Sequence, residues 1–235
     1  MALPVLNTPT YELIVPSTGE TLKYRPFLVK EQKVLMIAQE AGNEKQILNA
    51  IGNIIESCTF DELKNVHTLP TYDIEYIFVN IRARSVGESI ELEVTCPDDE
   101  KTKVPVVIDL NELKVEKNEN HNNVIQLTDT IGMTMRYPSI ANLGAYAGKN
   151  KDVAKMTFDV IADCIENVFD ENEVYEEMSK KELHDFIDQL TTDQFEKVQE
   201  FFDSMPKLKH TIKVVNPNTE VESEIVLEGM QSFLG

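Results

Sequence analysis

A cluster of turn-forming residues near the start of the chain constrains the fold more than any other segment. Residues 16–19 read Pro-Ser-Thr-Gly and separate two runs rich in β-branched and aromatic residues, 10–15 and 21–27. Gly19 can adopt a positive φ angle and close the turn. Pro26 then precedes an apolar stretch with helical spacing. The sequence therefore predicts a β-hairpin that leads directly into a helix.

Helical patterns recur along the rest of the chain. Ser179 with Glu182 and Thr191 with Gln194 have the spacing of capping boxes, which mark helix starts. The predicted helices run from about 29 to 41, from a break at Gly42 and Asn43 to about 56, from Pro70 to about 84, over 153–168, from 179 to 190 and from 191 to Pro206. A further short helical turn is expected at 59–63. One side of the first helix is expected to be lined by Val34, Leu35, Ile37, Ala38 and Ala41.

Alternating apolar and polar residues predict three more antiparallel hairpins. Their strands are expected at 90–95 with 104–110, 124–127 with 133–137, and 210–215 with 224–227. The predicted fold class is α+β, with antiparallel β-hairpins, amphipathic helices and a helical C-terminal half closed by a final hairpin. Either the hairpins at 90–110 and 210–227 pair into one sheet, or each covers its own module.

A polar stretch divides the chain into two predicted modules. Residues 111–123 are rich in Asn, Lys and Glu and have the composition of a linker. The N-terminal module would cover residues 1–110 as hairpin, helices and hairpin. The C-terminal module would cover 124–235 as helices with the terminal hairpin. The length of 235 residues suits one large domain or two small ones.

Two of the predicted hairpins resemble each other. One turns at Cys96-Pro97-Asp98 and the other at Asn216-Pro217-Asn218, and each hairpin follows an apolar helix. The residue before each proline is biased away from helix. The likeness indicates either two helix-plus-hairpin modules of related design or a chance similarity, because strand alternation carries little information.

The charge of the chain limits its partners. The formal net charge is −19, which repels phosphate backbones and excludes nucleic acid as an expected partner. No apolar run approaches the roughly 20 residues of a membrane helix, and the N-terminus lacks the features of a signal peptide. Residues 151–200 hold 15 acidic and 5 basic side chains. This stretch is either a solvated helical face or an acidic docking face for a basic partner.

The sequence offers no constellation that predicts catalysis. No phosphate-binding glycine loop and no H-E-x-x-H motif occurs, and the four histidines are not clustered. The three cysteines, Cys58, Cys96 and Cys164, are far apart, so they imply no disulfide framework and fit a reducing compartment. We expect no catalytic residue, no cofactor and no metal ligand.

The junction between the first hairpin and the first helix holds an arginine between two aromatic residues, Tyr24, Arg25 and Phe27. Tyrosine and arginine are enriched at binding hot spots, so this segment could anchor a partner. The structural alternative is a guanidinium stacked over a ring.

Several of these strings resemble a known family. Residues 11–13, 16–20 and 24–33, together with the stretch 73–88, are similar to the N-terminal signature of the baseplate hub assembly proteins of T4-like contractile-tailed phages. In relatives, such hairpin tips often carry Cys-x-x-Cys knuckles. Here only Cys96 remains of that pattern, since position 99 is Asp and position 216 is Asn.

The resemblance implies a non-enzymatic protein of the myovirus tail baseplate, made in the host cytoplasm. It would bind other hub or tail proteins during virion assembly, as a chaperone-like helper that covers a subunit surface and leaves. The first alternative is a permanent structural component of the virion baseplate. A metal- or thiol-dependent enzyme is the remote alternative. Self-association is left open.

We assign partner binding to two groups of residues. The first is Tyr24, Arg25 and Phe27. The second is the acidic set within 170–177, which consists of Asp170, Glu171, Glu173, Glu176 and Glu177.

Overall fold

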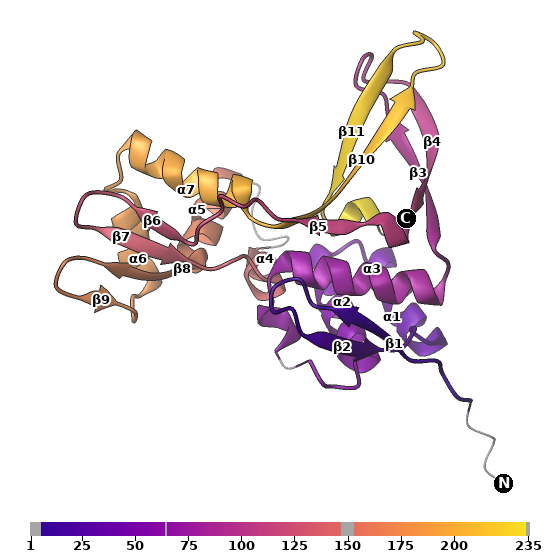
Figure 1. The fold of residues 1–235 in the computed structure, drawn as a ribbon, viewed down its shortest axis with the longest axis horizontal. Helices are drawn as coiled ribbons and strands as arrows, with labels where there is room; N and C mark the ends of the chain where they lie inside the picture. Colours follow the sequence, from indigo (N-terminus) through magenta and orange to yellow (C-terminus); the bar gives the residue numbers. More distant parts are fainter. Residues whose placement is uncertain (1–5, 64, 147–152, 234–235) are drawn as a thin grey trace.

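Three hydrophobic cores organise the chain. The computed structural model describes residues 6–63, 65–146 and 153–233. Figure 1 shows an N-terminal body that holds the first hairpin and α1–α3, a hairpin arm that projects from it, and a C-terminal lobe that extends sideways. The fold class is α+β with small antiparallel sheets, as predicted.

The N-terminal body follows the sequence prediction closely. Strands β1 and β2 pair antiparallel, and Gly19 closes their turn with φ +73°. Gly42 ends α1 with φ +61°, and the Asn43 side chain caps α2. The elements are β1 (Tyr11–Ile14), β2 (Thr21–Tyr24), α1 (Val29–Glu40), α2 (Glu44–Cys58), the short 3₁₀ helix η1 (Val66–Thr68) and α3 (Thr71–Ser85).

Two details of this body differ from the prediction. In α1, Ala38 is buried as predicted, but Val34 and Ile37 of the expected apolar side are 46% and 66% exposed, and the charged Glu31 is buried. The helix is rotated this way because Glu31 pairs with a buried arginine beneath it. The expected helical turn at 59–63 does not form, since Phe60 and Asp61 adopt positive φ angles of 57° and 56°.

The hairpin arm joins segments that are far apart in sequence. It contains β3 (Ser89–Thr95), β4 (Lys103–Asp109), η2 (Leu110–Glu112), β5 (Lys114–Glu116), β10 (Lys207–Val215), β11 (Glu222–Glu228) and η3 (Met230–Phe233). The predicted linker 111–123 includes β5, which pairs with β10. Hairpins β3–β4 and β10–β11 belong to different sheets but share one core. The terminal hairpin, predicted as part of the C-terminal module, therefore packs beside the second hairpin of the N-terminal module.

The C-terminal lobe is a four-stranded antiparallel sheet, in the order β6-β7-β8-β9, packed against helices. Both predicted capping boxes are present, at Ser179 and Thr191. The elements are β6 (Val124–Gln126), β7 (Gly132–Met135), α4 (Ile140–Tyr146), α5 (Val153–Cys164), β8 (Ile165–Phe169), β9 (Val174–Tyr175), α6 (Lys180–Ile187) and α7 (Thr192–Ser204). Helix α4 lies at the junction with the body, where Ile140 joins its core.

One helix prediction in this lobe is wrong. The helix expected over 153–168 ends at Cys164, and the chain continues directly into β8. Strand β8 pairs antiparallel with β7 on one side and with β9 on the other. Ile165 and Val168 are buried, as the helix pattern also required. Residues three apart lie on one side of a helix. Here the pairing of β8 with β7 shifts register between Thr134 and Met135, so both side chains can face the core. This change places 170–177 at the edge of a sheet.

Candidate functional site

The Arg25 side chain lies inside the N-terminal body. Its guanidinium donates to Glu31 Oε1 at 3.0 Å, to the Ser57 hydroxyl at 3.0 Å and to two backbone carbonyls. Burial raises the pKa of Glu31, but hydrogen bonds from Arg25, Leu28 and Ser57 outweigh it and lower the pKa to about 2. Arg25 is thus a structural cation that ties the end of β2 to α1 and α2.

The aromatic neighbours of Arg25 have packing roles as well. Tyr24 is buried, and its ring lies 5.7 Å from that of Tyr11. Phe27 packs against the core of the body. The guanidinium that stacks over a ring belongs to Arg84, 5.2 Å from the Tyr11 centroid. These positions give Tyr24, Arg25 and Phe27 structural contacts, in which Arg25 forms hydrogen bonds and is not the guanidinium stacked over a ring.

The acidic edge, defined as Asp170, Glu171, Glu173, Glu176 and Glu177, follows β8 and includes the flanks of β9. Asp170 stabilises the turn between β8 and β9. Its carboxylate accepts from the backbone N–H groups of Asn172 at 2.7 Å and Glu173 at 2.9 Å, and from the Tyr175 hydroxyl at 3.2 Å. These bonds lower the pKa of Asp170 and keep it ionised.

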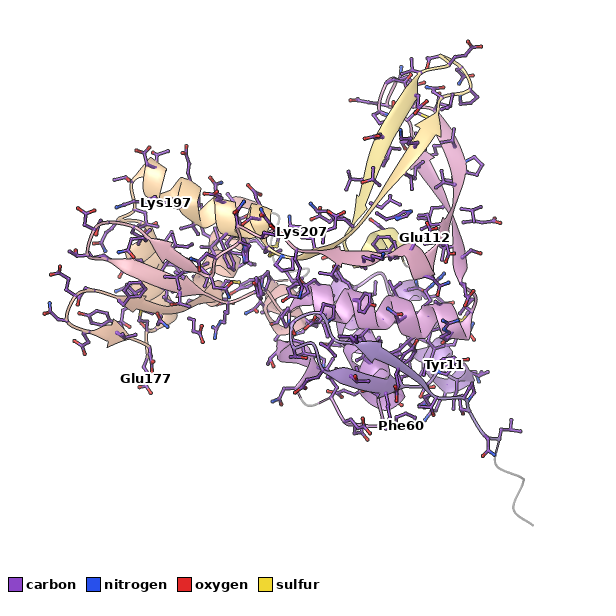
Figure 2. All side chains as sticks on the ribbon, viewed as in Figure 1. Tyr11, Phe60, Glu112, Glu177, Lys197 and Lys207 are labelled. Atoms are coloured by element: carbon purple, nitrogen blue, oxygen red, sulfur yellow. The ribbon has the colours of Figure 1, made fainter. Side chains whose placement is uncertain are left out.

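The other four carboxylates of the acidic edge stay in solvent. Their side chains are exposed and make no ion pair or hydrogen bond with the described residues. Figure 2 shows Glu177 at the rim of the lobe, pointing away from it. The nearby Lys180 does not neutralise them, because it pairs with Asp159 at 3.2 Å and Asp163 at 3.5 Å on α5.

A groove of about 440 Å³, which we call the lobe groove, opens beside the acidic edge between the sheet and α6. Apolar side chains form most of its walls and acidic side chains stand at its rim. The apolar residues are Ile131, Val168, Phe169, Tyr175, Met178 and Phe186. The acidic residues are Asp170, Glu182 and Asp185, and Gln189 completes the lining.

The hairpin tips, residues 96–102 and 216–221, show what replaces the knuckle pattern. Asn216 donates to both carboxylate oxygens of Asp98 at 3.0 Å, and Thr219 donates to Asp98 at 2.5 Å. Asp99 accepts from Thr102 within its own turn. The two turns share a backbone hydrogen bond from Glu100 to Cys96 in one and from Glu220 to Asn216 in the other, and both glutamates have a positive φ angle. A hydrogen-bonded cluster therefore joins the two tips.

The described cysteine thiols and possible metal ligands do not gather into one site. Burial raises the pKa of Cys58 to about 11 and that of Cys164 to about 12, so both thiols are protonated at neutral pH. Cys96 is buried between the tips. No group of three or more His, Cys, Asp and Glu side chains within 6–63, 65–146 and 153–233 is arranged to hold a metal ion. None of the described helices is long and apolar enough to cross a membrane.

Comparison with known proteins places the chain in a family. The family model described as T4 bacteriophage base plate protein matches residues 8–235. The chain belongs to this T4 base plate protein family. The match covers the acidic edge, the lobe groove and both hairpins, and so extends the resemblance seen in the N-terminal strings. No curated protein and no solved structure is matched by the chain.

The sequence patterns of this base plate protein do not predict the lobe groove. Its walls come from the β6–β7 turn, from β8 and β9, and from α6, which only the tertiary structure brings together. One local signal was present. The run Ile165–Phe169 is rich in β-branched and aromatic residues and is followed by Asp-Glu-Asn, which is typical of a strand and turn. That signal would have placed the acidic edge on a hairpin.

Proposed function

We propose that this base plate protein is a non-enzymatic assembly factor of the base plate hub, made in the host cytoplasm. It binds other hub subunits during base plate morphogenesis and covers part of a subunit surface until the next subunit arrives. Family membership supports a phage base plate protein with tail proteins as partners. The hub and the helper role extend that support through the resemblance of residues 11–33 and 73–88 to hub assembly proteins.

The observation that carries the proposal is the set of four solvated carboxylates on the acidic edge, Glu171, Glu173, Glu176 and Glu177. Within 166–188 there are nine acidic and two basic side chains, so these charges repel one another and do not favour folding. Charges of this kind accelerate encounter with a basic partner and suppress wrong partners, while adding modest affinity. A helper that must leave under competition needs this balance.

The chemistry of the described residues favours binding over catalysis. The cysteine thiols are buried. His184 bonds to Asp159 at 3.0 Å, and His121 bonds to the Ser204 hydroxyl at 2.9 Å and lies against the rings of Tyr137 and Phe201. A general base needs a nucleophile and a substrate site within reach. The Ser204 hydroxyl donates to the Glu200 carbonyl, and neither histidine lines the lobe groove. The lobe groove is apolar with a charged rim, which suits a protein segment.

The test is capture of tail proteins from infected cells with the tagged full chain. We expect hub or tail proteins among the captured species. Reversing four charges with Glu171→Lys, Glu173→Lys, Glu176→Lys and Glu177→Lys should lower the captured amount about tenfold, because the electrostatic attraction becomes repulsion. The matched control reverses four exposed glutamates elsewhere, Glu20, Glu40, Glu91 and Glu93, and should leave capture unchanged.

The outcomes separate the alternatives. Recovery of only metabolic enzymes or nucleic acid would contradict the proposal. Equal loss with both charge reversals would assign the effect to net charge and not to the acidic edge. Mass spectrometry of purified virions then distinguishes a helper from a permanent component, since a helper is absent from the particles and a component is present in fixed stoichiometry.

A further inference from the structure

We infer that the lobe groove holds a segment of another base plate protein that inserts an apolar side chain between β8 and α6 and carries lysine or arginine on both sides of it. This inference rests on the proposed function and specifies the chemistry of its partner. The groove has a volume of about 440 Å³, enough for a few large side chains and within the range of protein binding sites.

Two apolar residues at the opening of the groove are exposed although the groove adjoins a core. Ile131 is 37% exposed and Tyr175 is 43% exposed, and both line the opening. Covering apolar surface is favourable by about 25 cal/mol per Å². The Tyr175 ring offers contact area at low cost in conformational entropy, while its hydroxyl already donates to Asp170 at 3.2 Å. These walls favour an apolar or aromatic anchor over a polar chain.

The groove is held in shape before any partner binds. Gly132 lies against the Phe169 ring, and a Cβ at position 132 would come within 2.3 Å of its Cζ atom. The Asp170 turn fixes the end of β8, and the Ser179 capping box fixes the start of α6. A site that is already ordered loses less entropy on binding, so a short segment is sufficient.

The rim sets the charge of the occupant. Asp170, Glu182 and Asp185 line the groove, and the glutamates of the acidic edge continue the negative surface outward. Hydrogen bonds from Ser179 lower the pKa of Glu182, so it stays ionised together with Asp170. Lysine or arginine on both sides of the anchor would meet these carboxylates.

A second copy of this chain does not offer such a segment. Its net charge of −19 opposes approach to the acidic edge. In the described residues, the large apolar side chains that lie directly between two basic residues are Tyr24, between Lys23 and Arg25, and Leu208, between Lys207 and Lys209, and both are buried. Both flanking lysines, Lys207 and Lys209, pair with Glu228. The occupant is therefore a different protein.

The test uses a photo-crosslinker on the full-length chain. Cys58, Cys96 and Cys164 are buried, so one introduced cysteine takes up a benzophenone maleimide selectively. Lys181→Cys places the probe on exposed α6, one helical turn before Asp185, and Gln32→Cys on exposed α1 is the matched control. The labelled proteins are added to a lysate of infected cells, irradiated, and the crosslinked peptides are identified by mass spectrometry.

We expect the probe at position 181, but not at 32, to crosslink a tail-protein peptide with an apolar residue between basic residues. Tyr175→Ser should lower this yield about tenfold, the effect of losing one anchor contact. Tyr175→Phe keeps the ring and should leave the yield unchanged. A variant that simply unfolds is recognised by a changed circular dichroism spectrum, and Asp185→Lys, on an exposed position, then serves as the second groove variant.

The alternative outcomes are distinct. Crosslinks from 181 to an acidic or wholly polar peptide, to this chain itself, or to nothing while tail proteins are still captured would overturn the groove inference and leave the proposed function standing. Absence of tail proteins from every capture would instead contradict the proposed function.

Discussion

The hairpin tips and the acidic edge both place aspartate and glutamate side chains at the ends of β-hairpins, but their surroundings differ. At the tips, Asp98 accepts three hydrogen bonds from Asn216 and Thr219 of the opposite hairpin. At the acidic edge, Glu173 and Glu176 flank β9 with no partner among the described residues. The same residue types therefore join two hairpins in one region and face solvent in the other.

The difference shows how to separate carboxylates that stabilise the fold from those that are available for binding. Hydrogen bonds lower the pKa of Asp98 and Asp99 at the tips. Such a shift links ionisation to folding. The exposed glutamates of the acidic edge have no such bonds, so replacing them should not change stability. Asp170 belongs to the first class although it lies in the acidic region, because it forms the β8–β9 turn.

The largest expected effect sharpens the comparison with a third carboxylate, Glu31, in the N-terminal body. Glu31→Gln removes the partner of buried Arg25 and should lower the free energy of unfolding by about 3 kcal/mol at pH 7. Glu171→Gln on the acidic edge is the control and should change it by less than about 0.5 kcal/mol. Urea denaturation of both variants measures the difference. Equal effects would remove the distinction between the two classes.

The difference in stability between wild type and Glu31→Gln should depend on pH. The pKa of Glu31 is about 2 in the folded state and about 4.5 when unperturbed, so its contribution is present above pH 4.5 and is lost as the pH falls toward 2. The stability gap between wild type and Glu31→Gln should therefore close over this window. A gap that is constant from pH 6 to pH 2.5 would show that the pairing does not depend on ionised Glu31.

The second effect tests the tips. Asn216→Ala removes a fully buried amide that donates to both oxygens of Asp98, and should cost about 2 kcal/mol of unfolding free energy. Asn172→Ala, in the turn of the acidic edge, removes an exposed side chain with no bond of its own and should cost less than about 0.5 kcal/mol. Denaturation curves in which both variants match wild type would mean that the tip bonds do not contribute to stability.

The third effect concerns the contact between Gly132 of β7 and the Phe169 ring of β8, which lines the lobe groove. Gly132→Ala would push Phe169 away from β7 and should destabilise the lobe by about 2 kcal/mol, with weaker capture of tail proteins although every charge is retained. Gly144→Ala is the matched control, because its Cβ has only Lys45 Cγ at 4.0 Å and lies in α4, where alanine favours helix. Thermal denaturation and capture assays measure both. Intact capture by a destabilised Gly132→Ala protein would indicate that the partner does not use the groove.

Local signals in the sequence were sufficient for several elements. The Ser179 and Thr191 capping boxes and the Gly19 turn were predicted because each depends on residues within four positions of one another. The α+β class followed from the same kind of evidence. Arg25 was harder to assign, since its partners include Ser57, 32 positions away. The sequence showed an arginine between aromatics but not the carboxylate beneath it.

The site illustrates the same limit. The charges of 170–177 are evident from composition, but the spacing of Ile165 and Val168 fits a helical stripe and so predicts one helix over 153–168. The pairing of β8 with β7, which decides the matter, is a non-local contact. The lobe groove needs three separate segments to meet, so its position could not be predicted from any window of the sequence.

The smallest expected change in stability belongs to the acidic edge itself. Replacing Glu171, Glu173, Glu176 and Glu177 by Gln removes four like charges and should leave the free energy of unfolding within about 0.5 kcal/mol of wild type, or raise it slightly, because repulsion is relieved. Capture of tail proteins should fall, and its remaining dependence on salt should be weaker than in wild type, since screening acts on the charges that were removed. The control, in which Glu20, Glu40, Glu91 and Glu93 are replaced by Gln, should keep capture and its salt dependence close to wild type, because these exposed glutamates lie outside the acidic edge. If the four-Gln variant loses stability instead, these glutamates serve folding as Asp98 does, and the contrast between the two regions disappears.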